Sequence, residues 1–466
     1  MKKNKAKSRR DFLKTTAASA AWLSLGTFGV KTSPAQGTAW TAGMRINPAI
    51  PNTRVVSCTD EKMISDMEKA KVMSTFAGTA NQNTCINTAR VEENMDAMAQ
   101  ALTGKPSAQE AWSTVFMKPA AKEWRSVKAA IKANCATTLI MPKIAVVNKV
   151  CVELMRLGVA AANITIYDAV DDASGSEKYT PFIGNGLPDG IVVSSLTREG
   201  VSVPVGSGTL QCCSVLARQD GPTIVYPTDI LINCAVNKGH NTGYGQFTMC
   251  MKNHTGSIKF SCPTQEELIA MNQCEAIIGG TDGAPCRQQL CIVDSLWASW
   301  VGPTNPPDYL PCTISMGTLA PAVDYQVAMK IRKEVMNAPP EEKWIDPWLE
   351  RFNINKTDLE WIVVLPAMIR KNEPLNADRA NFHLMLDKGH FKRSSVLFEL
   401  PYNADPQSVS IYNIRGNLVR CLKDIKRHTV VWDGKDQNGR LVPSGNYAVS
   451  VKAGSVTKSA TLKLVR

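Results

Sequence analysis

Sequence signatures of several common enzyme classes are missing from this chain of 466 residues. It has no phosphate-binding loop ending in Gly-Lys-Ser/Thr, no Gly-x-Gly-x-x-Gly after a predicted strand and no Gly-x-Ser-x-Gly elbow, so the usual nucleotide-binding and serine-hydrolase classes lose support. It has only five histidines, no His-x-x-x-His pair and no repeated Cys-x-x-Cys units. Zinc-ribbon and ferredoxin-type sites are therefore not predicted.

The chain also has little net charge outside its two ends. Of the formal charge of +12, residues 1–35 supply +7, and residues 400–466, with eleven basic and four acidic residues, supply another +7. The body between them has a net charge of −2. Because no basic stripe is interleaved with aromatic residues, nucleic acid is not predicted as a partner.

The N-terminus has the pattern of an export signal. Ser8-Arg9-Arg10-Asp11-Phe12-Leu13-Lys14 is typical of a twin-arginine motif, and the mildly apolar stretch Thr15–Val30 follows it. Ser33-Pro34-Ala35 predicts cleavage after Ala35. The sequence thus predicts export by the twin-arginine translocase to the periplasm or another extracytoplasmic site. A single membrane anchor is the alternative, although the stretch is shorter than the ~20 apolar residues of a span.

Fourteen cysteines follow this segment. The closest spacings are Cys212-Cys213 and Cys286-x4-Cys291. Outside the cytoplasm thiols can form disulfides. We expect mainly structural or disulfide cysteines, with metal ligation and redox catalysis as open alternatives.

Residues 36–390 are predicted to form an α/β body with a largely parallel sheet, whose core spans about 120–335. Strand patterns alternate with helical ones such as Ala145–Leu157, and this alternation is typical of parallel sheets. Ligands of such sheets bind beyond the carboxyl ends of the strands. Residues 36–110 and the region after Pro339 show weaker patterns.

Residues 395–466 change character. Short alternating strands separated by turn residues predict a small all-β sandwich of the immunoglobulin-like type. Trp432 is expected in its core. Asp436-Gln437-Asn438-Gly439 predicts a tight turn, with a calcium loop as a weaker alternative, since Gly434 and Gly445 stand where acidic ligands are needed.

Two resemblances to known families follow from these segments. The C-terminal part resembles the immunoglobulin-like domain of the flagellar hook-capping family, through the blocks Val409–Gly416, Val431–Arg440 and Val442–Tyr447. That resemblance implies a spacer or adhesion module and an envelope partner.

The body resembles exported members of the domain of unknown function 362 family. The resemblance is carried by six blocks: Ile131–Asn134, Asn163–Asp168, Asp229–Asn233 with Lys238-Gly239-His240, Met251–Gly256, Ile292–Asp294 and Ala322–Asp324. The chain departs from the family where Leu319 replaces a common Asp, and it lacks the ferredoxin-type cysteine runs of some relatives.

The glycine-rich segment 237–245 follows an apolar strand and forms the centre of a candidate site. Lys238, His240 and Lys252 are the candidate catalytic residues, because lysines can hold an anion and a histidine can move a proton near neutral pH. Lys132, Asn134, Asn253, Asp294 and Asp324 are the candidate binding residues for a ligand or cofactor. The alternative is a plain glycine-rich turn with solvated lysines.

Three functions remain open from the sequence. The first is an exported enzyme that acts on a small anionic molecule, with a cofactor that the sequence does not identify. The second is a non-catalytic envelope binding protein that docks through its C-terminal domain. The third is a redox or metal-binding protein that uses its cysteines.

Overall fold

The computed structural model describes residues 40, 44–72, 78–168, 186–194, 200–240, 244–258, 263–280, 285–364, 396–399, 407–413, 415–423, 429–432, 434–453 and 456–464. The chain divides into two compact units, Met1–Met368 and Ile369–Arg466, each of which is described by itself. Arg9, Arg10 and the expected cleavage site after Ala35 lie outside the described residues.

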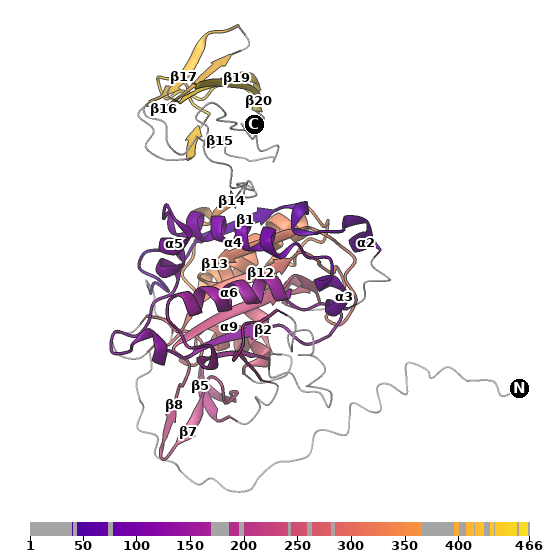
Figure 1. The fold of residues 1–466 in the computed structure, drawn as a ribbon, viewed down its shortest axis with the longest axis vertical. Helices are drawn as coiled ribbons and strands as arrows, with labels where there is room; N and C mark the ends of the chain where they lie inside the picture. The colour runs from indigo at the N-terminus through magenta and orange to yellow at the C-terminus, as the bar shows by residue number, and fades with distance from the viewer. Residues whose placement is uncertain are drawn as a thin grey trace, which may run out of the picture. The chain divides into compact units, whose positions relative to one another are not determined.

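The first unit is built on an eight-stranded mixed sheet, mostly parallel, with the strand order β14-β1-β13-β12-β9-β2-β3-β4 (Figure 1). Five of the seven strand pairings are parallel, and the two pairings of β13 are antiparallel. The strands are β1 (Arg54–Thr59), β2 (Ala129–Ala133), β3 (Ile164–Tyr167), β4 (Val192–Ser194), β9 (Ile230–Val236), β12 (Gln288–Ser295), β13 (Thr313–Gly317) and β14 (Glu360–Val364).

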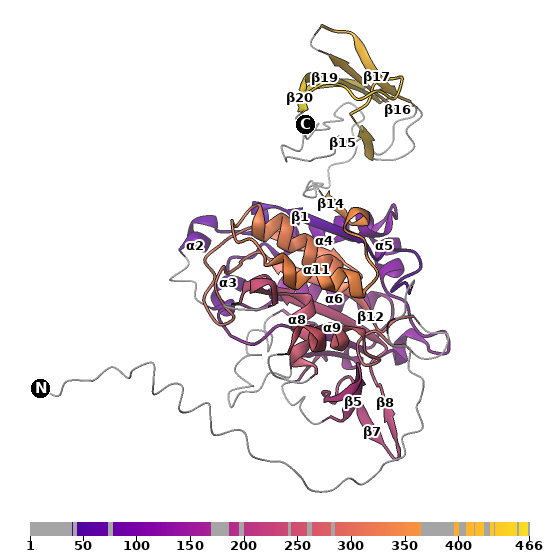
Figure 2. The same cartoon turned by 180° about the vertical axis from the view of Figure 1, so that it is seen from behind.

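Helices cover both faces of this sheet. Figure 1 shows α4 (Thr88–Thr103), α5 (Ala108–Val115) and α6 (Ile144–Arg156) on one face. Figure 2 shows α8 (Cys250–Asn253), α9 (Gln265–Gln273) and α11 (Glu342–Arg351) on the other. α10 (Ala320–Val327) contributes to the same second core, and a π-helical turn over Ala328–Lys333 continues it. Each face therefore has its own apolar core, and the unit is a three-layer α/β structure.

The remaining elements of this unit are short. Two hairpins, β5 (Ser202–Val205) with β6 (Gly208–Gln211) and β7 (Arg218–Asp220) with β8 (Thr223–Val225), project from the body in both views (Figures 1 and 2). α2 (Met67–Lys71) and α3 (Thr79–Asn83) precede α4. The pair β10 (Lys238–Gly239) and β11 (Phe247–Thr248) follows β9.

Local sequence explains the borders of the site-bearing elements. α6 ends before Gly158, where the backbone φ of +105° is a conformation that favours glycine. β9 is buried along its whole length and reads ILINCAV, as expected for a central parallel strand covered on both faces. The antiparallel strand β13 was not predicted from the sequence. Its polar Ser315 lies opposite Ser57 of β1, and the two hydroxyls share a hydrogen bond of 3.1 Å.

The second unit consists of small antiparallel sheets. β15 (Val396–Glu399) pairs with β18 (Thr429–Trp432), and a four-stranded sheet has the order β17 (Leu418–Leu422), β16 (Gln407–Asn413), β19 (Gly445–Ala453) and β20 (Val456–Leu464). Trp432 is buried as expected, and its indole N–H donates to the Lys435 carbonyl at 2.7 Å. The Asp436 carboxylate accepts hydrogen bonds from the N–H groups of Asn438 and Arg440, as in a plain turn.

Candidate functional site

The carboxyl ends of three neighbouring parallel strands bring together residues that are far apart in the sequence. Lys132 lies near the end of β2, Asp168 directly follows β3, and Lys238 follows β9. Parallel strands end at one edge of a sheet, so these polar side chains gather there although the strands are separated by helices and loops. All three are buried.

Lys132 and Asp168 form an ion pair inside the protein. The ammonium lies 2.8 Å from the carboxylate, and the side chains are 1% and 2% exposed. Lys132 also donates to the Ala133 carbonyl at 2.8 Å and to the Asn253 side chain at 2.9 Å. The ion pair and these two hydrogen bonds hold the Lys132 ammonium in place, so Lys132 contributes a fixed charge to the site.

Asn253 connects the strand ends to α8. Its amide oxygen accepts from the side chains of Lys132 and Asn134, the latter at 3.1 Å. Its amide nitrogen donates to the Lys132 carbonyl at 3.1 Å and to the Asn233 side chain at 2.8 Å. The predicted binding residues Lys132, Asn134 and Asn253 are thus one hydrogen-bonded group.

Lys238 differs from Lys132 because its ammonium has no hydrogen-bond partner among the described residues, although only 1% of the residue is exposed. Burial, above all, lowers the pKa of Lys238 to about 7. The positive charges of Lys252 and Lys132 lower this pKa further, whereas Asp168 and Cys135 oppose the shift. A buried donor without a partner is costly, which makes Lys238 the strongest candidate for a ligand-binding group among these residues.

Two further buried polar atoms near these residues have no partner. Thr248 lies opposite Lys238 in the β10–β11 pair, and its hydroxyl is unsatisfied. The side-chain oxygen of Asn134 is unsatisfied as well. The edge therefore offers two hydrogen-bonding atoms in addition to the Lys238 ammonium.

The other two candidate catalytic residues contact each other. The Lys252 ammonium lies 3.0 Å from the His240 Nε2, and His240 is half-buried. The backbone N–H of His240 donates to the Gln246 carbonyl, which fixes the start of the glycine-rich segment. Residues 241–243 of that segment lie outside the described residues.

Close backbone packing requires a glycine at position 239. A Cβ atom there would lie 1.8 Å from the Trp300 carbonyl oxygen, so the backbone after Lys238 packs directly against the loop that follows β12. The Gly239 N–H donates to the Ser299 hydroxyl at 3.2 Å. The glycine serves close backbone packing that keeps Lys238 in place.

The structure gives the two predicted aspartates other partners. Asp294 accepts from the N–H groups of Lys143 and Leu296 and so holds the start of α6. Asp324 accepts from the N–H groups of Cys250 and Met251, and burial raises its pKa to about 7 against the effect of these hydrogen bonds. Asp324 therefore positions α8, which carries Lys252 and Asn253.

Sequence reasoning missed Asp168 and Thr248 as site residues. Asp168 stands directly after a strand, a position that was available as a signal. Thr248 had none, because only the β10–β11 pairing places it opposite Lys238. His254, next to Asn253, is fully buried, and burial lowers its pKa to about 3, so this histidine is neutral at physiological pH.

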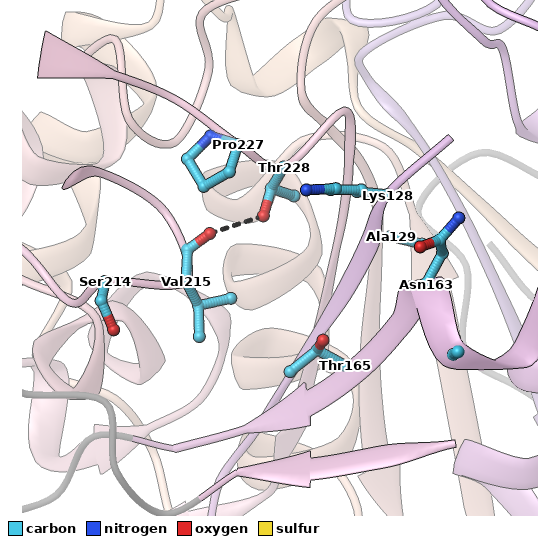
Figure 3. A pocket seen from close by; sticks show the side chains of 9 residues that line it. Lys128, Ala129, Asn163, Thr165, Ser214, Val215, Pro227 and Thr228 are labelled. Atoms are coloured by element: carbon cyan, nitrogen blue, oxygen red, sulfur yellow. Dashed lines mark hydrogen bonds between the residues drawn. The ribbon is translucent and has the colours of Figure 1, made fainter. Parts of the chain in front are cut away.

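A cavity of about 260 Å³ lies at the amino ends of the central strands. Figure 3 shows the side chains that line it. Ala129, Thr165 and Thr228 of its wall stand at the amino ends of β2, β3 and β9, and Lys128 is beside them. The Thr228 hydroxyl donates to the Val215 carbonyl at 2.8 Å. This cavity is therefore separate from the Lys132 and Lys238 group, which stands at the other ends of the same strands.

The cysteines of the described residues are free thiols. All are buried except the half-buried Cys421, and this includes the close pairs Cys212-Cys213 and Cys286-x4-Cys291. Within the described ranges, no three His, Cys, Asp or Glu side chains gather into a potential metal site. No described helix is both long and apolar enough to cross a membrane.

Comparison with known proteins identifies the second unit. A model of the FlgD Ig-like domain matches residues 386–456, which confirms the predicted hook-capping-type domain and suggests an extracytoplasmic protein. No curated protein matches the chain.

Eleven chains of solved structures match as well. One is PorZ, an essential bacterial surface component of the type-IX secretion system of Porphyromonas gingivalis, with 25% identity over 15% of this chain and 9% of that chain at a TM-score of 0.14. Another is FLGD from P. aeruginosa, with 23% identity over 15% of this chain and 57% of that chain at a TM-score of 0.13. The chain thus spans less than two thirds of either of these chains.

Proposed function

We propose that the body is an exported enzyme of the domain of unknown function 362 type that binds a small anionic molecule at the carboxyl edge of its sheet. The observation that carries the proposal is the Lys238 ammonium, buried without a hydrogen-bond partner beside two further lysines. Among the described residues, Asp168 is the one carboxylate that raises the pKa of Lys238. Asp168 is already paired with Lys132. An anion would relieve this excess of positive charge.

In this proposal the lysines bind the anion through their charge, and a histidine transfers protons. Lys238 and Lys252 attract the anion, while Lys132 adds its field through fixed hydrogen bonds. Thr248 and Asn134 offer the unsatisfied hydroxyl and amide oxygen that orient a polar ligand. His240, 3.0 Å from the Lys252 ammonium, is the proposed acid–base group.

We further propose that the chain leaves the cytoplasm by the twin-arginine route, since Arg9 and Arg10 precede a mildly apolar stretch and a cleavage pattern at Ala35. In this proposal the two sets of small C-terminal sheets form an immunoglobulin-like sandwich that docks to an envelope partner. The family match to residues 386–456 supports this second, non-catalytic role.

Anion-dependent stabilisation of the purified full-length chain tests the binding proposal. We expect 2-hydroxy and 2-oxo acids to raise the unfolding midpoint. A ligand at a hundred times its Kd adds about 2.7 kcal/mol to the free energy of unfolding.

Lys238→Met should abolish this gain. Lys128→Met, at the other end of β2, is the matched control and should retain it. If no anion stabilises the protein, or if Lys128→Met alone removes the effect, the carboxyl-edge site is wrong.

A further inference from the structure

Lys238 has the surroundings of a reactive amine as well as those of an anion-binding ammonium. Its Nζ is enclosed, has no hydrogen-bond partner, and faces the charges of Lys252 and Lys132. We propose that Lys238 attacks the carbonyl carbon of a small 2-oxo acid and holds it as an imine, which rests on the anion-binding function proposed above.

Thr248 is placed to orient the carbonyl group. It pairs with Lys238 across the β10–β11 ladder, and side chains of such a pair point to the same face with Cβ atoms about 5 Å apart. Its buried hydroxyl has no partner in the structure. A hydrogen bond from this hydroxyl to the carbonyl oxygen would direct the carbon toward the Lys238 nitrogen.

The neighbouring cations favour a carboxylate on the same molecule. Lys252 carries charge beside Lys238, whereas the Lys132 ammonium is already held by an ion pair with Asp168 and by hydrogen bonds to Ala133 and Asn253. A carboxylate has two oxygens to satisfy, and a phosphate has more. The small number of unsatisfied donors at this edge therefore fits a 2-oxo acid better than a phosphorylated aldehyde.

The reaction balances without an oxidant or reductant. The lone pair of the neutral amine forms the C–N bond, and the carbonyl oxygen becomes a hydroxyl. Loss of water then gives the imine, with both amine hydrogens leaving on the oxygen. The Lys252–His240 pair, 3.0 Å apart, is the nearby proton carrier for the dehydration step.

The charges around Lys238 favour the neutral amine that this reaction needs. Burial lowers its pKa to about 7, Lys252 and Lys132 lower it further by repulsion, and Asp168 and Cys135 act in the opposite direction. Near neutral pH a large share of Lys238 is therefore uncharged. An ordinary exposed lysine is neutral in only about one molecule in a thousand at pH 7.4.

Reductive trapping tests the imine. The full-length chain is incubated with pyruvate or glyoxylate and sodium cyanoborohydride, and the modified lysines are located by peptide mass spectrometry. We expect nearly stoichiometric modification of Lys238, with a rate that increases as pH rises through about 7. The exposed Lys128 should react at least tenfold more slowly, although exposure alone would favour it.

Two variants and one ligand separate the outcomes. Lys238→Arg retains a cation but should lose the fast, stoichiometric trapping and keep only the slow reaction of exposed lysines, whereas Lys128→Met should be trapped like the wild type. Lactate, which has the carboxylate but no ketone, should compete with pyruvate. If lactate and pyruvate bind but Lys238 is not trapped, the imine is wrong and the anion site stands. If neither binds and trapping follows lysine exposure, both proposals are wrong.

Discussion

Two buried lysines of the body, Lys149 on α6 and Lys238 at the sheet edge, show how differently one fold treats the same charge. The Lys149 ammonium lies 2.6 Å from Glu153 and 2.7 Å from Asp96, and it is also near the Trp112 ring. The Lys238 ammonium has no hydrogen-bond partner. A buried charge that serves the fold is paired, so the unpaired one is the better guide to function.

Removing the paired lysine should have the largest effect. Lys149→Met leaves the buried Glu153 with Arg156 as its remaining partner, because the i,i+4 pair is lost. We expect a loss of about 3 kcal/mol in the free energy of unfolding, measured by urea denaturation at pH 7. Lys330→Met, which breaks a more exposed pair with Glu334, should cost less than about 1 kcal/mol. Equal losses in the two variants would contradict the idea that the buried ion pairs of Lys149 stabilise the fold.

Crowding the ion pair at the sheet edge should have an intermediate effect. In Gly256→Ala the new Cβ would lie 2.0 Å from an Asp168 oxygen and 3.0 Å from the Lys132 ammonium. We expect a loss of about 1–3 kcal/mol in stability and weaker anion binding, measured by denaturation and calorimetry. Gly208→Ala, whose Cβ would meet nothing within 4 Å, is the control. Unchanged anion binding in Gly256→Ala would show that the Lys132–Asp168 ion pair does not contribute to the anion site.

Removing the unpaired lysine should change stability in the opposite direction, by an amount that depends on pH. The pKa of Lys238 is lowered from 10.5 to about 7 on folding, so between these values the unfolded chain binds more protons than the native one. This group therefore makes stability rise with pH from about 7 to 10.5, and its full penalty is present below pH 7. Lys238→Met should be more stable than the wild type below pH 7, where the penalty is present, and should lose that slope.

A pH series of urea denaturation curves for the wild type and Lys238→Met checks this sign. The exposed Lys128→Met should keep the wild-type slope. An identical slope in wild type and Lys238→Met would show that Lys238 does not titrate in this range.

Much of the parallel sheet could be predicted because its strands are continuous apolar runs between helices, as with Ile230–Val236. The antiparallel pairing of β1 with β13 could not, because both strands mix polar with apolar residues. The buried Ser57 shares a hydrogen bond of 3.1 Å with Ser315, and the exposed Thr59 shares one of 2.7 Å with Thr313. No pattern in the local sequence predicts a hydrogen bond between hydroxyl groups on neighbouring strands.

The placement of a candidate residue could be predicted where it stands near the carboxyl end of a strand. Lys132 and Lys238 do so, whereas Asn253 belongs to α8 and joins the same group through its hydrogen bond with Lys132. Asp294 and Asp324 instead hold backbone N–H groups, a use that residue type and spacing cannot distinguish from ligand binding. Thr248 depends on a two-residue ladder that periodicity cannot detect.

Both the oxygen and the nitrogen of the Asn253 side-chain amide already make hydrogen bonds within the protein, which affects how the site can bind a ligand. Since this amide fixes Lys132, Asn134 and Asn233 before any ligand arrives, binding need not immobilise those side chains. Ordering one long side chain costs about 0.5–1.5 kcal/mol, a large fraction of the affinity that a molecule of few atoms can supply. The sheet edge is thus preorganised for a small ligand, which can supply at most about 1.5 kcal/mol of binding free energy per heavy atom.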